Sequence, residues 1–527
     1  HVLTNTHWDR EHRHGFQETR LMLTELLDRL IEIMEADPEF KHFILDGQVV
    51  TLDDYFEMKP GKREAIEKLV RDDRLHIGPW YTLPDMTSIA PEGIIRNLLK
   101  GYRMSESLGK VMNFGYSIFS FGQISQLPQI YSGFGIDDVI FYKGYNKDII
   151  KKSEFWWQSP DGTRVLTSRL GKRCRWNFIW RFTIPVILGG DPEVAAEWQA
   201  SFNSGYRLTH PVDPAFRLSH SIELDREVTI RREKIKQAVA ECIGDVEPWT
   251  QAPEALLFFD GIDFTTPVPE ITEALKQANE ICADEGELFQ STPMAYFEDL
   301  RRLLDLNNLP VYEGEMRMGP VSEVHSESMS ANIEILRALG PVERTLLNCA
   351  EPFLAFASIL GDEYPQAALD LCWKYLFHSH AHDSVHGLGV PKIKRDTLHR
   401  LDQADELSNS LARRAFEKIV SRIDTSPLEQ GDIVITAFNP TACTRNDVME
   451  LQIDLPQEDY ASEWWVETLD GQRIDSYNLE EKQTSMAMVC AENRPKPVHV
   501  DRYLAQVALP QLPPFGYRTF RICRTKN

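Results

Sequence analysis

The 527-residue sequence lacks long apolar runs, runs of Lys and Arg, and closely spaced cysteine pairs. A membrane-spanning helix needs roughly 20 consecutive apolar residues, whereas the longest runs here, such as 255–259, have the length of a strand. The formal net charge is -23, and because such a surface repels phosphate, we expect neither nucleic acid nor a membrane as partner. The eight cysteines include no CxxC pair, which favours reduced thiols and a cytoplasmic location.

The composition is that of a folded protein with several domains. Hydrophobic residues make up 42% of the chain and charged residues 26%, and a domain takes roughly 100 to 200 residues, so we expect about three domains. Residues 1–320 alternate short apolar runs with amphipathic segments, which predicts an α/β domain around a largely parallel sheet. Residues 321–428 predict a helical bundle, and the β-rich runs of residues 429–527 predict an antiparallel sandwich.

Within the first domain, apolar periodicity assigns individual elements. The predicted strands cover residues 2–6, 42–46, 138–142 and 255–259, and the predicted helices cover residues 18–36, 63–70 and 91–108. Pro91 suits the first turn of the last of these helices.

The segment after the first predicted strand is a candidate site. His7 and Asp9 alternate about Trp8, so in an extended backbone their side chains point the same way and could share one metal ion. The ends of strands in α/β sheets and barrels are also where ligand sites collect. A plain hydrogen-bonded pair is the alternative interpretation.

A second candidate is the histidine cluster of residues 378–386, which holds four of the 15 histidines. On one helix, His378, His382 and His386 would lie on the same face, a spacing that suits a metal site and a polar helix surface equally. Combined with His7 and Asp9, the cluster supplies the nitrogen and oxygen ligands that zinc prefers.

The two candidates belong to a set of six motifs along the chain. In order and spacing they resemble the α-mannosidases of glycoside hydrolase family 38, over most of the first ~420 residues. The motifs are residues 1–11, 43–48, 77–85, 95–99, 120–130 and 382–384.

The resemblance implies a distorted α/β barrel, a three-helix bundle and β-sandwich domains, with the last part truncated relative to the family. It also implies one Zn²⁺ per chain, held by His7, Asp9 and His382, that binds the 2- and 3-hydroxyls of a terminal mannose. Asp383 would hydrogen-bond sugar hydroxyls, and Trp80 would form an aromatic wall of the pocket. The partner would be a mannose-containing carbohydrate, and a homo-oligomer is possible on the sequence alone.

Retaining hydrolysis needs two carboxyl groups about 5 to 5.5 Å apart, one as nucleophile and one as acid and then base. The Gly-x-Asp motif of the family falls on residues 261–263, so the resemblance makes Asp263 the acid/base. Asp260 is close enough in sequence to be confused with it.

The nucleophile position departs from the family. Where the family has aspartate in Gly-Tyr-Leu-Pro-Asp-Ser-Phe-Gly-Gln, this chain has Phe119. A benzyl side chain can neither attack an anomeric carbon nor bind zinc, and loss of a catalytic group commonly costs several orders of magnitude in rate. Other family positions also differ and are occupied by His12, Met86, Phe264 and Asn332.

Three functions follow from these residues. The first is a zinc-dependent retaining α-mannosidase whose activity is reduced by Phe119. The second is a carbohydrate-binding pseudoenzyme on the mannosidase scaffold. The third is a metal-dependent deacylase, because three protein ligands with an open fourth position are typical of a catalytic zinc that activates water.

Overall fold

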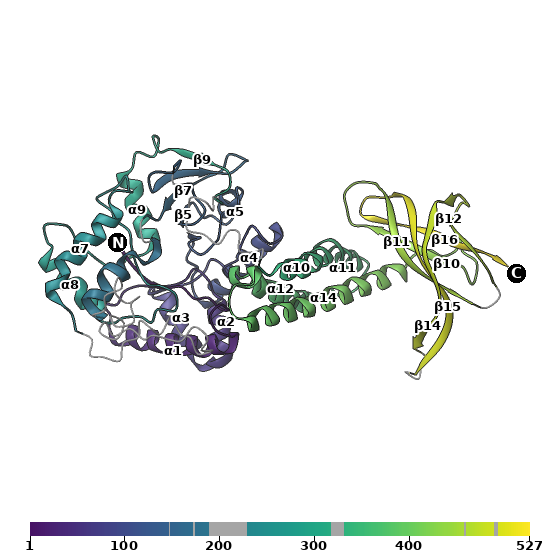
Figure 1. The fold of residues 1–527 in the computed structure, drawn as a ribbon, viewed down its shortest axis with the longest axis horizontal. Helices are drawn as coiled ribbons and strands as arrows, with labels where there is room; N and C mark the ends of the chain where they lie inside the picture. The colour runs from purple at the N-terminus through teal and green to yellow at the C-terminus, as the bar shows by residue number, and fades with distance from the viewer. Residues whose placement is uncertain are drawn as a thin grey trace. The chain divides into compact units, whose positions relative to one another are not determined.

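A computed structural model describes residues 1–146, 148–171, 174–188, 229–317, 331–457, 460–489 and 494–526 (Figure 1). The chain divides into two compact units, which are His1–Pro341 with Leu371–Ala404, and Val342–Asp370 with Asp405–Asn527. Among the described residues, no helix is both long enough and apolar enough to cross a membrane. The domain boundaries drawn from the sequence stay predictions.

The first unit contains a parallel sheet with the strand order β3-β2-β1-β8. Every residue of these four strands is buried, as expected for short apolar strands covered on both faces. Because all four run the same way, their carboxyl ends meet at one edge, where a site can form. The strands are β1 (Val2–Thr6), β2 (Phe43–Leu45), β3 (Leu75–His76) and β8 (Phe258–Asp260).

A second sheet of the same unit has the order β4-β5-β7-β6-β9, in which only β6 and β7 pair antiparallel. The amide of Met112, just before β4, donates to the carbonyl of Ile77, just after β3, at 2.8 Å. The two sheets thus continue one another as the predicted distorted barrel. The strands are β4 (Gly115–Tyr116), β5 (Asp138–Phe141), β6 (Glu154–Gln158), β7 (Arg164–Arg169) and β9 (Val311–Glu313).

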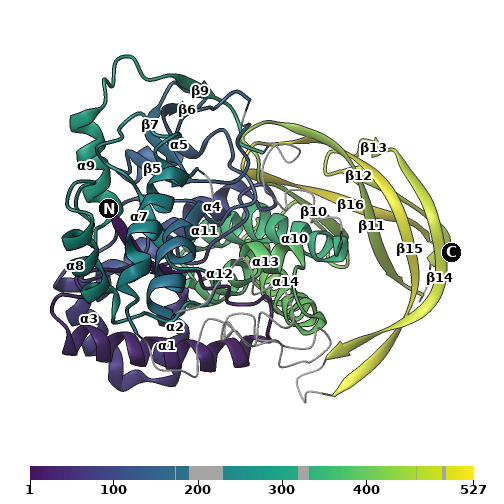
Figure 2. The same cartoon turned by 60° about the vertical axis from the view of Figure 1, so that its left-hand side comes forward.

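Helices lie on the outside of these sheets (Figure 2). Helix α1 shows why: its leucines and isoleucines recur every three to four residues and form a buried stripe. The helices are α1 (Phe16–Ala36), α2 (Val50–Met58), α3 (Arg63–Arg71), α4 (Pro91–Leu108), α5 (Leu127–Gly133), α7 (Arg232–Val246), α8 (Ile271–Ile281) and α9 (Pro293–Leu303). The short 3-10 and π segments between them are η1 (Pro60–Lys62), η2 (Cys174–Trp176) and η3 (Ile179–Leu188).

The predicted helical region is helical, with one break that matters for the site. Helix α12 ends at His380, Ala381 is extended (φ -49°, ψ 136°), and α13 begins at His382. His378 therefore lies on a different helix from His382 and His386, and the single helical face considered from their spacing does not form. The helices are α10 (Ile333–Thr345), η7 (Leu346–Ala350), α11 (Glu351–Ile359), α12 (Gln366–His380), α13 (His382–His386) and α14 (Pro391–Val420).

The break has a tertiary cause. The amide of His382 donates to the carbonyl of Leu83 at 2.9 Å, and the amide of Asp85 donates to the carbonyl of His380 at 3.2 Å. The loop after β3 therefore binds backbone groups that a continuous helix would have satisfied internally.

The β-rich end of the chain, in the second unit, is an antiparallel sandwich as predicted. Its two sheets have the orders β10-β16-β12-β13 and β11-β15-β14, and alternating residues such as Tyr503, Ala505 and Val507 fill the space between them. The strands are β10 (Ile433–Asn439), β11 (Arg445–Pro456), β12 (Tyr460–Thr468), β13 (Arg473–Ile474), β14 (Ser476–Val489), β15 (Pro495–Leu512) and β16 (Gly516–Lys526).

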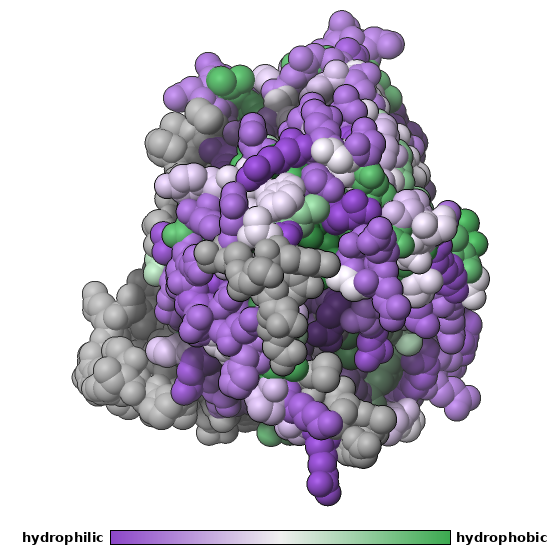
Figure 3. All heavy atoms as spheres, turned by 90° about the vertical axis from the view of Figure 1, so that its right-hand side faces the viewer, coloured by the Kyte–Doolittle hydropathy of each residue, from purple (hydrophilic) through white to green (hydrophobic). Residues whose placement is uncertain are grey.

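Figure 3 shows one face of the molecule, coloured by hydropathy. Most residues on this face are hydrophilic, and the apolar ones lie in small separate groups, as expected of a chain with a net charge of -23.

Candidate active site

Two of the residues expected in the site lie just beyond the carboxyl ends of neighbouring strands. His7 follows β1 and Asp263 follows β8, and the two residues form an isolated parallel bridge. The amide of Phe264 donates to the carbonyl of His7 at 2.7 Å. The pairing of β1 with β8 thus places the candidate metal ligand beside the candidate acid/base.

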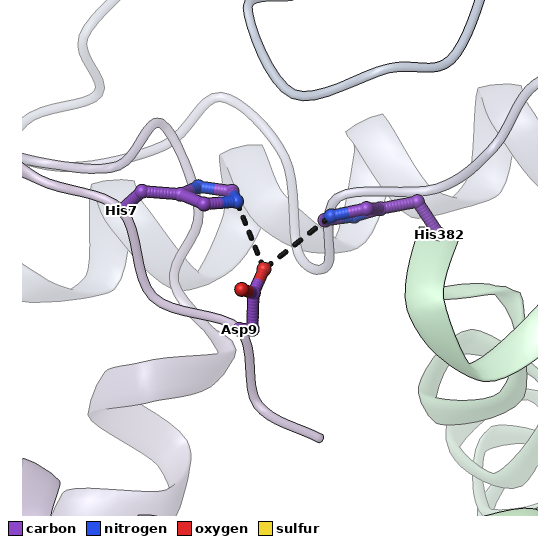
Figure 4. Close-up of side chains that lie close together, drawn as sticks. All are labelled: His7, Asp9 and His382. Atoms are coloured by element: carbon purple, nitrogen blue, oxygen red, sulfur yellow. Dashed lines mark ion pairs between the residues drawn. The ribbon is translucent and has the colours of Figure 1, made fainter. Parts of the chain in front are cut away.

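His7, Asp9 and His382 converge within the first unit (Figure 4). The carboxylate of Asp9 lies between the two imidazoles, with Oδ1 at 2.8 Å from Nε2 of His7 and 3.4 Å from Nε2 of His382. One ligand atom from each residue lies within 4.8 Å of the others, and all three residues are buried. The structure therefore brings together the three residues that the sequence predicted as ligands.

The donor set fits a divalent cation. Oδ1 of Asp9 is buried and accepts no hydrogen bond of good geometry, although two ring nitrogens face it. Two imidazoles and one carboxylate are ligands that zinc prefers, and they leave room for a further ligand.

Each imidazole is oriented by a partner on its other nitrogen. Nδ1 of His7 contacts both carboxylate oxygens of Asp46 at 2.9 and 3.0 Å, and Nδ1 of His382 donates to the carbonyl of Leu83 at 3.1 Å. Such contacts fix the tautomer that leaves Nε2 available to a metal. Asp46 lies in a motif of the sequence, but its role was not predicted.

The surroundings of the trio also favour a positive charge. Burial and the nearby Arg175 act to lower the pKa of His7, but the carboxylates of Asp46 and Asp9 outweigh them and raise this pKa to about 10. Burial of Asp9 is likewise outweighed by His7 and His382, which hold the pKa of Asp9 well below its usual range. A positive charge is thus stabilised at the centre of the trio.

The trio opens onto a cavity of about 510 Å³. Asp263 lies in its wall between two guanidinium groups: Nη2 of Arg13 lies 3.2 Å from Oδ2, and Arg175 donates to Oδ1. Burial opposes ionisation of Asp263, but Arg175 first and then His7 and Arg13 lower its pKa. The lining residues are His7, Asp9, His12, Arg13, Phe121, Tyr142, Lys143, Arg175, Trp176, Asp263, His382, Asp383 and Leu388.

Asp383 lines the same cavity. Its Oδ2 lies 3.6 Å from Nδ1 of His12 and 3.7 Å from Nε2 of His382. Burial and the nearby carboxylate of Asp9 raise the pKa of Asp383 to about 8. Its position is compatible with the hydrogen-bonding role that the resemblance implies.

Phe119 is 1% exposed and its ring packs against other rings of the site. Ring centroids lie 5.8 Å apart between Phe119 and His382 and 6.1 Å apart between Phe119 and Trp80. The phenyl group thus lies beside a candidate metal ligand and offers no atom for nucleophilic attack.

Trp80 is fully buried, and its indole N–H donates to the carbonyl of Tyr116 at 3.1 Å. It contacts Phe119 but is not among the described residues that line the cavity. Its role as a pocket wall stays a prediction.

A buried ion-pair network ties the ligand segments together. Nη1 and Nη2 of Arg400 each donate to one oxygen of Glu11 at 2.6 Å, and Oγ of Ser384 donates to Glu11 at 2.8 Å. Because Glu11 lies two residues after Asp9 and Ser384 two residues after His382, the network holds both segments in place. The sequence gives no local signal for Arg400.

The remaining candidates have structural partners. Nε2 of His378 lies 3.2 Å from the hydroxyl of Tyr81, and His386 pairs with Asp85. Asp260 accepts a hydrogen bond from Oγ1 of Thr183 at 2.5 Å and does not line the cavity. The structure therefore separates Asp260 from Asp263, although the two are close in sequence.

The N-terminal part of the chain matches a known family. Residues 1–315 match the sequence model of the glycosyl hydrolases family 38 N-terminal domain. A protein of Halalkalibacterium halodurans with the provisional name mannosylglycerate hydrolase is 26% identical over 439 residues, which are 81% of this chain and 43% of that protein.

Two solved structures from Enterococcus faecalis have the same fold over the whole of this chain. One, described as an alpha-mannosidase, is 24% identical with a TM-score of 0.80, and this chain covers 56% of it. The other, described as a family 38 glycosyl hydrolase, is 23% identical with a TM-score of 0.72 and is 54% covered. The chain thus spans about half the length of the relatives it matches.

Proposed function

Because the chain belongs to glycoside hydrolase family 38, we propose that it is a zinc-dependent α-mannosidase of the retaining type, with turnover limited by Phe119. One observation carries the proposal: three candidate zinc ligands converge in the cavity that also contains Asp263 and Asp383. The substrate would be a terminal α-linked mannoside.

His7, Asp9 and His382 would hold the ion. Bound zinc acts as a Lewis acid and would hold and polarise sugar hydroxyls. Asp46 and Leu83 fix the imidazole orientations through the outer ring nitrogens. The carboxyl group of Asp383, beside this trio, is placed to hydrogen-bond a sugar hydroxyl.

Asp263 would act as the acid/base. Two guanidinium groups, from Arg13 and Arg175, favour its carboxylate form before substrate binds. As the acid, Asp263 would have to carry a proton when the glycosidic bond breaks and give it to the leaving-group oxygen, and its carboxylate would then accept a proton from the attacking water. Substrate contacts with either arginine would change how strongly this carboxylate holds a proton.

Phe119 removes the covalent step. In retaining hydrolysis a second carboxylate attacks the anomeric carbon, and the phenyl group of Phe119 cannot do this. The close packing of Phe119 with His382 and Trp80 therefore also favours a second candidate function, which is carbohydrate binding without turnover.

The name of the Halalkalibacterium relative suggests one glycoside to test. Mannosylglycerate carries mannose on glycerate, and it would bring a terminal mannose and a carboxylate group into the same cavity. We include it beside neutral mannosides as a candidate substrate.

The test begins with metal content and turnover. We expect about one zinc per chain by mass spectrometry, and slow release of the aglycone from an aryl α-mannoside at high enzyme concentration that a chelator abolishes. A zinc-loaded protein that binds mannoside without releasing the aglycone would select the binding function. A folded protein that binds neither zinc nor mannoside would refute both functions.

Replacement of a ligand sharpens this test. His7→Ala removes one of three protein ligands, so we expect zinc content to fall to near zero while the fold is kept. The exposed His399 provides the matched control, because His399→Ala removes an imidazole far from the trio in sequence and outside the cavity lining.

A further inference from the structure

Two histidines meet where β2 begins to pair with β3. His42 is the residue before β2, and His76 is the last residue of β3. Nδ1 of His42 lies 3.1 Å from Nε2 of His76, and the ring centroids lie 5.2 Å apart. We propose that this pair is an acid-sensitive latch, which holds β3 against β2 at neutral pH and releases β3 when the pair takes up a proton. The latch would act whether or not the chain hydrolyses mannosides.

The two imidazoles share one hydrogen. Nδ1 of His42 also lies 3.2 Å from the carbonyl oxygen of Asp73, which can only accept, so Nδ1 carries the hydrogen. Nε2 of His76 then accepts this hydrogen with its lone pair. If Nε2 of His76 takes up a proton, two N–H groups face each other across 3.1 Å and the contact becomes repulsive.

The position of His76 favours the neutral form. His76 is 4% exposed, and His42 is half-buried. Burial, followed by the nearby His42, lowers the pKa of His76 to about 4. Burial also lowers the pKa of His42, although Asp73 opposes this shift. The closed pair is therefore neutral at pH 7.

The charged groups around the pair do not compensate for an added proton. Oδ1 of Asp73 lies 4.0 Å from Nδ1 of His76, but Nζ of Lys110 contacts the same oxygen at 2.6 Å. Asp73 favours protonation of both histidines. Lys110, Lys41 and Arg74 each oppose protonation of one histidine of the pair. One carboxylate thus faces three cations, and further positive charge is unfavourable there.

The strand that the latch holds is short. β3 has two residues, and the amide of Phe43 at the start of β2 donates to the carbonyl of Arg74 at 2.9 Å. Because few backbone hydrogen bonds hold so short a strand, repulsion between the histidines can favour a locally open state. The loop after β3 carries Leu83, whose carbonyl accepts from the amide and from Nδ1 of His382. Release of β3 would therefore reach the loop that positions His382.

The direction of the pH effect follows from proton binding. In an open state His76 returns to the ordinary histidine pKa of about 6.5, so below this pH the open state binds more protons than the closed one. The contribution of the pair to the closed state is complete above about pH 6.5 and is lost as the pH falls toward about 4. At pH 5.5, opening should be about 10-fold more favourable than at pH 7.5.

Hydrogen exchange of the full chain tests the latch. Exchange is measured by mass spectrometry at pH 7.5 and 5.5 and corrected for the pH dependence of the intrinsic exchange rate. We expect protection of residues 43–50 and 75–85 to fall about 10-fold at pH 5.5. Residues 164–169 of β7, in the same unit, should keep their protection. An equal loss in all three segments, or no loss in the first two, overturns the latch.

His76→Gln removes the titrating imidazole but keeps an oxygen that can accept the hydrogen of His42. We expect the loss of protection at pH 5.5 to shrink to less than about twofold in this variant. His399→Gln is the matched control: it removes an exposed histidine of α14 and should leave the loss as it is in the unaltered chain. A full loss in folded His76→Gln overturns the latch.

His76→Leu gives a second variant if His76→Gln does not fold by circular dichroism. It removes both the titrating group and the acceptor, while His42 keeps the carbonyl of Asp73 as its partner. We again expect a loss of less than about twofold at pH 5.5, because no buried imidazole remains at position 76. A loss of about 10-fold in this variant overturns the latch.

Discussion

The candidate metal ligands and the nucleophile position at Phe119 differ in how many polar side chains support them. On the ligand side, His7 is oriented by Asp46, and Glu11 and Arg400 hold the segments that carry the other ligands. At the nucleophile position, a phenyl ring packs against aromatic neighbours and carries no reactive group. The difference teaches that the candidate metal ligands are held in place whether or not residue 119 carries a carboxylate.

The largest effect should come from restoring a carboxylate at position 119. We expect Phe119→Asp to raise release of an aryl α-mannoside aglycone by at least ~100-fold and up to ~10⁴-fold, because it restores the missing carboxylate. The ammonium group of Lys143, next to the carbonyl of residue 119, offers a counter-charge for the new carboxylate.

Phe119→Asn is the control for this change, since it has nearly the same shape as aspartate without its charge. If Phe119→Asp stays as slow as Phe119→Asn while zinc content and fold are kept, the covalent step is not what limits this chain.

The next largest effect should come from breaking the ion pair between Arg400 and Glu11, which supports the segments of the candidate ligands. Arg400→Met leaves the buried carboxylate of Glu11 without its bidentate partner, and breaking such a pair costs about 3 kcal/mol or more of stability. We expect a lower melting temperature together with weaker zinc binding, measured by calorimetry and metal titration.

The double variant Arg400→Met with Glu11→Leu tests the reason. Removal of both charges should recover part of the stability, because no uncompensated carboxylate remains buried. If the double variant is as unstable as the single one, packing and not charge explains the loss.

A smaller effect should follow from the orientation of one ligand. Asp46→Asn weakens the contact that fixes His7, and we expect zinc affinity to fall by about 10- to 100-fold with little change in stability. Competition with a fluorescent chelator measures this fall. Asp53→Asn, which changes a carboxylate that contacts Tyr81 and Lys374, should leave zinc affinity unchanged.

The smallest effect concerns Asp260, the last residue of β8. Burial raises the pKa of Asp260 to about 6, so the native state binds this proton more tightly than the unfolded chain. The contribution of Asp260 is most favourable below about pH 4 and is lost as the pH rises through about 6.

We therefore expect Asp260→Asn to raise the melting temperature by about 2–4 °C at pH 7.5 and to have little effect at pH 4. Asp263→Asn should lower mannoside hydrolysis instead, without this pH-dependent gain in stability. A stabilisation of equal size at both pH values would show that the charge of Asp260 is not its cause.

The parts of the fold that local sequence controls were predictable. The helix predicted over residues 91–108 is α4, with Pro91 in its first turn and Gly109, at φ 137°, just after its end. The spacing of His7 and Asp9 predicted side chains that point the same way. In the structure, a possible ligand atom of each lies within 4.8 Å of the other.

The features that depend on tertiary contacts were not. Alanine favours helix, yet Ala381 is extended because Leu83 and Asp85 bind the backbone on either side of it. The strand predicted over 255–259 is shorter in the structure and ends at Asp260. The carboxyl group of Asp260 is buried there and accepts a hydrogen bond from Thr183, a partner distant in sequence. The cavity also brings together three cationic residues from distant segments, Arg13, Lys143 and Arg175. No local sequence pattern predicts that they meet.

The break at Ala381 has a consequence for the order in which the chain is made. It delivers His382 to a motif near the amino terminus, and the neighbouring Glu11 and Ser384 are 373 residues apart in sequence. At a synthesis rate of 5 to 20 residues per second, the ribosome needs roughly 20 to 75 s to cover that distance. During this interval His7 and Asp9 lack His382, the third member of the trio. The first strands must therefore stay able to fold until His382 has been made.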